Sequence, residues 1–120
     1  MSTPITVRVI AMSDQGFFIA AHNDGYCIFS LANPTKVELG DRLWCDVHGH
    51  SAATIRASNQ TRQDELSIDL VDWETSLDGA ISHLLKLGSP QYVHAGSKRI
   101  ATNSENVIIQ LQEEILRLKP

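Results

Sequence analysis

The sequence lacks the features that mark disulfide-linked, secreted and membrane-spanning proteins. Its 120 residues include two cysteines, Cys27 and Cys45, which are too few for a disulfide scaffold and would stay free thiols in a reducing cytosol. The longest apolar run is far short of a membrane span, and residues 1–4 start no signal peptide. We therefore expect a small cytoplasmic protein of a bacterium, folded as one domain and making no membrane contact.

Positive charge is also scarce. The chain has 10 Lys and Arg residues against 14 Asp and Glu residues, which gives a formal net charge of −4. It therefore lacks the basic footprint that many nucleic-acid binders carry. This balance counts against a nucleic-acid partner, although the local arrangement of charge matters more than the sum.

Motifs of catalysis and metal binding are missing as well. The chain has no Cys-x-x-Cys, His-Glu-x-x-His, Gly-x-Ser-x-Gly, Walker loop or dinucleotide fingerprint. His48 and His50 could offer two imidazoles to a metal, but two ligands one residue apart on a turn are more typical of a polar loop. We expect a protein that is not an enzyme and that uses no cofactor and no metal.

Carboxylates are plentiful in the last expected strand. Paired carboxylates can do acid–base work, but these alternate with Leu66, Ile68 and Leu70, as on a solvated strand edge. We therefore favour an edge strand. The carboxylates are Asp64, Glu65, Asp69, Asp72 and Glu74.

Residues 5–73 have the pattern of successive strands. The clearest signal is Asp24-Gly25, a pair typical of a tight hairpin turn, between the apolar runs 17–22 and 26–31. Residues 42–48 alternate between apolar and polar side chains, and residues 66–70 do the same, which predicts half-buried strands. A further strand is expected at residues 53–57.

After residue 73 the periodicity becomes helical. Thr75 and Asp78 predict a helix start, and apolar residues at helical spacing continue until Gly88 and Pro90. Residues 88–103 are polar and could hold a small hairpin around Gly96. A last helix is predicted over 104–119, with Thr102 and Glu105 at the spacing of a capping box.

The order of elements predicts the fold class. Strands with short loops, followed by helices, favour a mainly β protein: a five- to six-stranded antiparallel OB-like barrel followed by C-terminal helices. We expect residues 1–87 to form the barrel with a first helix that plugs an open end. Residues 88–120 would add the polar connection and the last helix.

The first half of the chain resembles the cold-shock domain. The similarity lies in Thr6-Val7-Arg8, Asp14 to Ile19, Asp24-Gly25, Ile28-Phe29-Ser30, Leu39-Gly40-Asp41 and Asp46-Val47. It covers roughly residues 5–58, and nothing after Trp73 belongs to it. That family is a five-stranded OB-fold barrel that binds single-stranded RNA and DNA, so the resemblance implies the same fold and ligand here.

The sequence departs from the cold-shock pattern at the aromatic positions. Val9 stands where the family has tryptophan, and Gly16-Phe17-Phe18 replaces its G-F-G-F. Neighbouring strand residues point to opposite faces, and the Phe17 face is the more apolar. We therefore predict that Phe17 fills the core, that Phe18 points outward, and that Phe29 pairs with Ala20 on the Phe18 face. The alternative is that Phe18 and Phe29 lie beneath the C-terminal helix.

The leading functional prediction is single-stranded nucleic-acid binding through stacking on this reduced platform, at roughly 1–3 kcal/mol for each stacked base. Trp44 would belong to it or serve as a contact for a partner, unless it packs beneath residues 75–87. The predicted contact residues are Arg8, Phe18, His22, Phe29, Trp44 and Arg56.

The alternative function is a protein-interaction or adaptor module that uses the barrel edge and the last helix. That helix carries one apolar seam, which needs a partner surface because a helix this short is marginal alone. It can dock on its own barrel, pair with a second copy as a homodimer, or wait for another protein. We favour docking or dimer pairing. The seam consists of Ile108, Leu111, Ile115 and Leu118.

Overall fold

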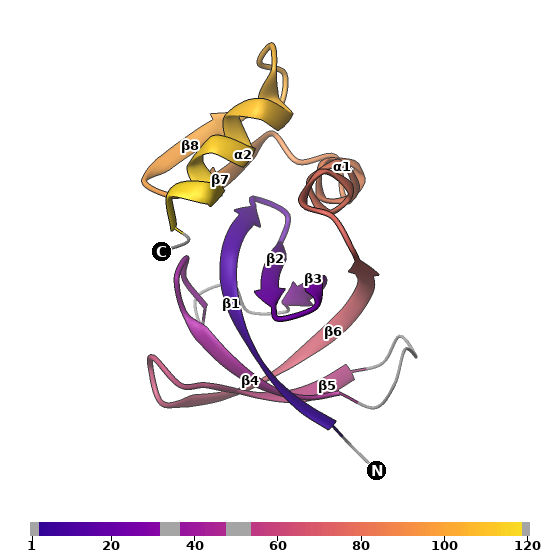
Figure 1. Ribbon diagram of the computed structural model, residues 1–120, viewed down its shortest axis with the longest axis vertical. Helices are drawn as coiled ribbons and strands as arrows, with labels where there is room; N and C mark the ends of the chain where they lie inside the picture. Colours follow the sequence, from indigo (N-terminus) through magenta and orange to yellow (C-terminus); the bar gives the residue numbers. More distant parts are fainter. Residues whose placement is uncertain (1–2, 32–36, 48–53, 119–120) are drawn as a thin grey trace.

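The computed structural model describes residues 3–31, 37–47 and 54–118, and it is mainly β with two C-terminal helices, as predicted. The strands and helices follow one another in the expected order (Figure 1). They are β1 (Thr3–Ser13), β2 (Phe17–His22), β3 (Gly25–Leu31), β4 (Arg42–Val47), β5 (Thr54–Asn59), β6 (Asp64–Glu74), α1 (Leu77–Lys86), β7 (Tyr92–Ala95), β8 (Lys98–Ala101) and α2 (Val107–Leu118). Neither helix is long and apolar enough to cross a membrane, among the residues described.

Six antiparallel strands close into a barrel. The ladder runs β2-β3-β6-β5-β4-β1, and β1 also pairs with β2, which completes the ring. Closure is consistent with a small OB-like barrel. It also leaves β6 paired on both sides, with β3 and with β5, so the predicted edge strand is wrong. Beyond the ring, β1 pairs with β7 of the predicted hairpin around Gly96.

Phe18 and Phe29 lie inside the barrel. Both side chains are fully buried, and their rings are 5.4 Å apart between centroids. The prediction that they face outward is therefore wrong, and they do not lie beneath the last helix either, because they share a core with Val7, Leu43 and other residues of the barrel wall. The reason is that β2 is buried on both faces, with Ile19 as inaccessible as Phe18. On β2, the more apolar face, which carries Phe17 and Ile19, therefore points out of the barrel.

The β2–β3 register also differs from the predicted one. Phe18 pairs with Phe29, and His22 pairs with Gly25, so Asn23 and Asp24 form the two-residue turn. Gly25 takes a φ of 150°, and a Cβ there would lie 2.7 Å from the backbone oxygen of Glu74. The turn therefore begins one residue earlier than Asp24-Gly25, while Phe18 and Phe29 stay on one face as predicted.

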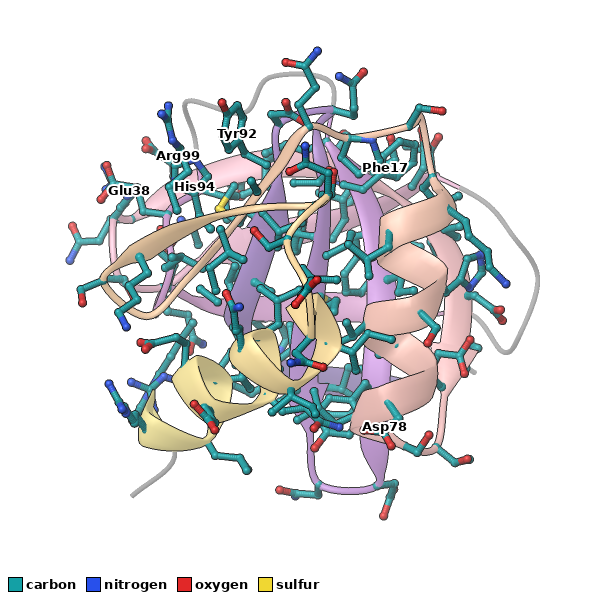
Figure 2. All side chains as sticks on the ribbon, turned by 90° about the horizontal axis from the view of Figure 1, so that it is seen from above. Phe17, Glu38, Asp78, Tyr92, His94 and Arg99 are labelled. Atoms are coloured by element: carbon teal, nitrogen blue, oxygen red, sulfur yellow. The ribbon has the colours of Figure 1, made fainter. Side chains whose placement is uncertain are left out.

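A second core separates the barrel from the helices. Ile19 and Ile28 point out of the barrel and pack with Ile81 and Leu84 of α1 and with Leu111 of α2. Figure 2 shows both helices and the β7–β8 hairpin lying over the strands. The first helix therefore covers the outer face of β2 and β3, and the prediction that it plugs a barrel end is wrong. Ser76 caps α1 by accepting the Gly79 N–H at 3.0 Å, one residue after the expected Thr75.

The last helix docks on its own chain. It begins at Val107 rather than Ser104, because Thr102 donates its hydroxyl to the Pro90 carbonyl and Asn106 has a φ of 58°. Leu111 and Ile115 of the predicted seam are buried, and Ile108 packs against them. The side chain of Leu118 and residue 119 lie outside the described part of the chain. The last helix is therefore docked on its own chain, which is one of the two outcomes favoured from the sequence.

Candidate functional site

The outer face of β4, β5 and the start of β6 is open, because the helices lie over the other side of the barrel, away from these strands (Figure 1). Alternation along these strands sends Leu43 and Cys45 into the core and leaves Trp44 outside, with 39% of the residue exposed. The outward direction predicted for Trp44 is confirmed, and the alternative of packing beneath residues 75–87 is wrong. We call this surface the Trp44 face.

Trp44 borders a shallow hollow of about 530 Å³. The register explains its composition, since Trp44 pairs with Ser58, Ser58 with Glu65, and Arg56 with Ser67. These pairs align one aromatic ring, short hydroxyl side chains and one charge of each sign along three strands. The lining residues are Trp44, Arg56, Ala57, Ser58, Glu65, Leu66 and Ser67.

The charge of the Trp44 face is mixed. Arg56 and Glu65 line the same hollow, and Asp69 lies further along β6, where it accepts a hydrogen bond of 2.5 Å from the Thr54 hydroxyl. Arg42 precedes Trp44 by two residues on the same side of β4 and is also exposed. A surface of this kind suits a polar partner with charges of both signs better than a polyanion.

Arg8 and His22 border a neighbouring hollow of about 380 Å³, together with Thr6 and Arg42. Thr6 pairs with Trp44, and Arg8 pairs with Arg42, so the two hollows adjoin across the β1–β4 ladder. Of the predicted nucleic-acid contacts, the structure therefore brings Arg8, Trp44 and Arg56 to the outer surface with His22 at its rim. It takes Phe18 and Phe29 away from them.

His22 is held by local contacts. Its ring meets the Trp73 ring edge-on at 5.3 Å, and its Nδ1 accepts the Asp24 N–H at 3.1 Å. Burial lowers the pKa of His22, and the Asp24 carboxylate offsets part of that effect. The imidazole therefore tends to stay neutral, which makes it a poor contact for phosphate.

The two thiols are structural. Cys27 and Cys45 are fully buried in the barrel core. Burial raises the pKa of Cys45 to about 12 and also raises the pKa of Cys27. Because the thiolate is the reactive form, neither side chain is poised as a nucleophile.

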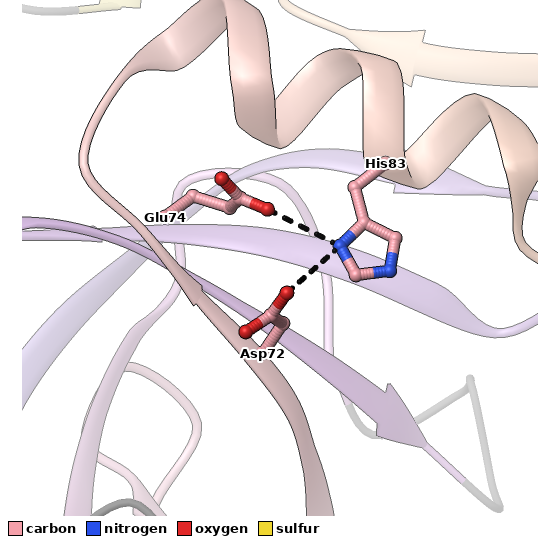
Figure 3. A group of neighbouring side chains, drawn as sticks. All are labelled: Asp72, Glu74 and His83. Atoms are coloured by element: carbon pink, nitrogen blue, oxygen red, sulfur yellow. Dashed lines mark hydrogen bonds and ion pairs between the residues drawn. The ribbon is translucent and has the colours of Figure 1, made fainter.

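A cluster that sequence analysis missed lies between β6 and α1. Asp72 and Glu74 project from the strand toward His83 of the helix (Figure 3). A bulge causes this, since Phe29 pairs with Leu70 and Ile28 with Asp72, which leaves Val71 as the extra residue. Strict alternation would have sent both carboxylates into the barrel. The only signal in the sequence is the adjacent apolar pair Leu70-Val71.

A third hollow, of about 440 Å³, lies where the hairpin meets β1 and includes His94 and Glu38. Figure 2 shows these two residues on one side of the molecule, near Tyr92 and Arg99, whose guanidinium carbon lies 4.3 Å from the Tyr92 ring centroid. Glu38 forms an ion pair with Arg62, which also binds Asp41. These contacts stabilise local structure. His48 and His50, the metal ligands considered from the sequence, lie outside the described residues.

No family model, curated protein or solved structure matches this chain.

Proposed function

We propose that this chain is a non-catalytic binding module and that its Trp44 face binds a protein partner. The observation that carries the proposal is the 39% exposure of Trp44 beside a hollow on an uncovered sheet face. Tryptophan and arginine are the residues most enriched in the energetic centres of protein interfaces, and Trp44 and Arg56 share this hollow.

The covered platform supports the same choice. Single-stranded nucleic acid binds OB-type barrels through aromatic side chains on which bases stack. Here Phe18 and Phe29 fill the core, and α1 covers the outside of β2 and β3. Glu65 and Asp69 on the remaining face would repel phosphates. A protein partner needs no aromatic platform for stacking, and its positive charges can pair with Glu65 and Asp69.

Trp44→Ala tests the proposal when compared with Leu116→Ala. Leu116 is 56% exposed on α2, so the second variant probes the rival contact surface on the last helix. Purified tagged wild type and variants are used to capture proteins from extract of cells that express the chain, and captured proteins are quantified by mass spectrometry. We expect at least one partner whose recovery falls about tenfold or more with Trp44→Ala and is unchanged with Leu116→Ala. Loss with Leu116→Ala alone would reject the Trp44 face.

Single-stranded nucleic acid remains a second candidate, because Arg8, Arg42 and Arg56 lie on or beside the Trp44 face and the first half of the chain resembles the cold-shock domain. Fluorescence anisotropy with labelled oligonucleotides tests it directly. Binding would weaken as salt rises and would weaken further with Arg56→Ala. Binding that survives both Arg56→Ala and Trp44→Ala would place the nucleic acid elsewhere, and no binding at low salt would remove this candidate.

A further inference from the structure

Three side chains that commonly ligate metals converge between β6 and α1. His83 Nδ1 lies 3.2 Å from Asp72 Oδ2 and 3.3 Å from Glu74 Oε1 (Figure 3). One ligand atom from each residue lies within 4.8 Å of the other two. The strand supplies both carboxylates at alternate positions, and the helix supplies the imidazole opposite them.

A hydrogen bond alone accounts poorly for this arrangement. Nδ1 carries at most one hydrogen, yet two carboxylate oxygens approach it at nearly equal distance. Both separations also exceed the roughly 2.7–2.9 Å that is usual for a charge-assisted bond from nitrogen to a carboxylate. Two carboxylates that share one proton donor leave an excess of negative charge at this point.

The separations fit ligands around a common cation. Bonds of about 2.0–2.1 Å from a metal to nitrogen and oxygen place neighbouring tetrahedral ligands about 3.3–3.4 Å apart, and ligands at right angles about 2.8–3.0 Å apart. The observed 3.2 and 3.3 Å lie between these values and closer to the tetrahedral one. The two separations from the imidazole are therefore compatible with one small ion, and all three ligand atoms lie within 4.8 Å of one another.

Neighbouring groups hold the carboxylates in this orientation. The backbone N–H of Trp73 donates to Asp72 Oδ1 at 2.8 Å, which leaves Oδ2 for the convergence point. Glu74 Oε2 occupies space beside Gly79, where a Cβ would lie 2.8 Å from it. The hydrogen bond to Asp72 is the kind of outer contact that orients a metal ligand, whereas the missing side chain of Gly79 leaves room for Glu74. The His83, Asp72 and Glu74 side chains keep 29%, 47% and 24% of their surface exposed, so an ion and a water molecule can reach them.

We propose that Asp72, Glu74 and His83 bind one divalent first-row cation, with Zn²⁺ as the representative, and that water completes its coordination. One imidazole with two carboxylates suits this class of metal, whereas Mg²⁺ and Ca²⁺ prefer oxygen ligands throughout. The ion ties α1 to the C-terminal end of β6. The proposal is independent of the Trp44 face, which lies on another part of the barrel.

Calorimetric titration of Zn²⁺ into the untagged, EDTA-treated full chain tests the site. We expect one ion per chain, a melting temperature that rises with Zn²⁺ concentration, and an absorption-edge spectrum with nitrogen and oxygen neighbours at about 2.0–2.1 Å and no sulfur. His83→Gln and Glu74→Gln should each weaken binding roughly 10-fold to 100-fold or more. Circular dichroism shows whether each variant keeps the fold. If His83→Gln does not fold, Zn²⁺ binding by Glu74→Gln decides the test.

Two matched controls distinguish Zn²⁺ binding at this site from Zn²⁺ binding by other histidines. His94→Gln removes an exposed imidazole on β7, and the double variant His48→Gln/His50→Gln removes the other imidazole pair. Both should bind Zn²⁺ as the wild type does. The proposal is overturned if the wild type binds no Zn²⁺, if the folded Glu74→Gln variant binds as tightly as the wild type, or if only the double variant loses binding.

Discussion

At the scale of single residues, Asp41 is the centre of a polar cluster at one end of the barrel. Its Oδ2 accepts hydrogen bonds from Asn59 Nδ2 at 2.8 Å, from the Glu38 N–H at 2.9 Å and from Arg62 Nε at 3.0 Å. Asn59 is fully buried, and its Oδ1 accepts the N–H groups of Thr61 and Arg62. The cluster fixes the loop before β4 and the turn after β5 to each other.

Asp41→Ala should lower the free energy of unfolding by about 1–3 kcal/mol, because it removes the acceptor of a fully buried amide. Urea denaturation of the wild type and the variant measures this. Asp64→Ala is the matched control, since Asp64 is exposed at the start of β6, and should stay within about 0.5 kcal/mol of the wild type. Equal effects of the two substitutions would mean that the Asp41 contacts add nothing to stability.

His22 should make stability depend on pH below neutrality. Burial lowers its pKa in the folded state below the ordinary value of 6.5, so the unfolded chain binds more protons between these two values. Its contribution is therefore complete above pH 6.5 and is lost as the pH falls through that window. Protonation of Nδ1 would also remove the acceptor of the Asp24 N–H.

Urea melts at about pH 7 and pH 5 measure this dependence. The free energy of unfolding of the wild type should fall more on acidification than that of His22→Asn, which cannot take up the proton. Parallel losses in the two proteins would contradict the assignment.

At the scale of elements, α2 presents two different faces. Ile115 is fully buried against the outer surface of the barrel, while its neighbour Leu116 is 56% exposed. Ile115→Ala should therefore lower the free energy of unfolding by about 2–5 kcal/mol, and Leu116→Ala by no more than about 0.5 kcal/mol. Thermal or urea denaturation compares them. Similar, small losses for both would mean that α2 is not docked as described.

How much of each element the sequence could predict depends on what covers it. In β4 one face meets solvent, so alternation alone placed Leu43 and Cys45 inside and Trp44 outside. In β2 both faces are buried, so the same reasoning could not tell Phe18 from Phe17. The cover on β2 comes from α1, which is distant in sequence, and apolar content alone does not show which core a residue joins.

The candidate sites divide in the same way. Trp44 and Arg56 were found because each sits on a regular strand with an exposed face. The cluster of Asp72, Glu74 and His83 depends on a bulge at Val71 and on the docking of α1, two features that strand periodicity does not encode. A shift of one residue in β6 decides whether these carboxylates face the barrel core or the helix.

At the scale of the whole molecule, two apolar cores leave one open sheet surface. The first core fills the barrel, and the second joins the outside of β2 and β3 to the helices and the hairpin. β4 and β5 lie away from this second layer (Figure 1). We therefore propose that a partner binds the Trp44 face and that α2 has a structural role.

Hydroxyl-radical footprinting tests that assignment most directly. The full chain is oxidised alone and in complex with the purified partner whose capture depends on Trp44, and side-chain oxidation is read by mass spectrometry. The account predicts that the partner strongly protects Trp44 and leaves Ile109 and Leu116, the exposed apolar side chains of α2, oxidised as before. Protection of Ile109 and Leu116 with unchanged oxidation of Trp44 would contradict it.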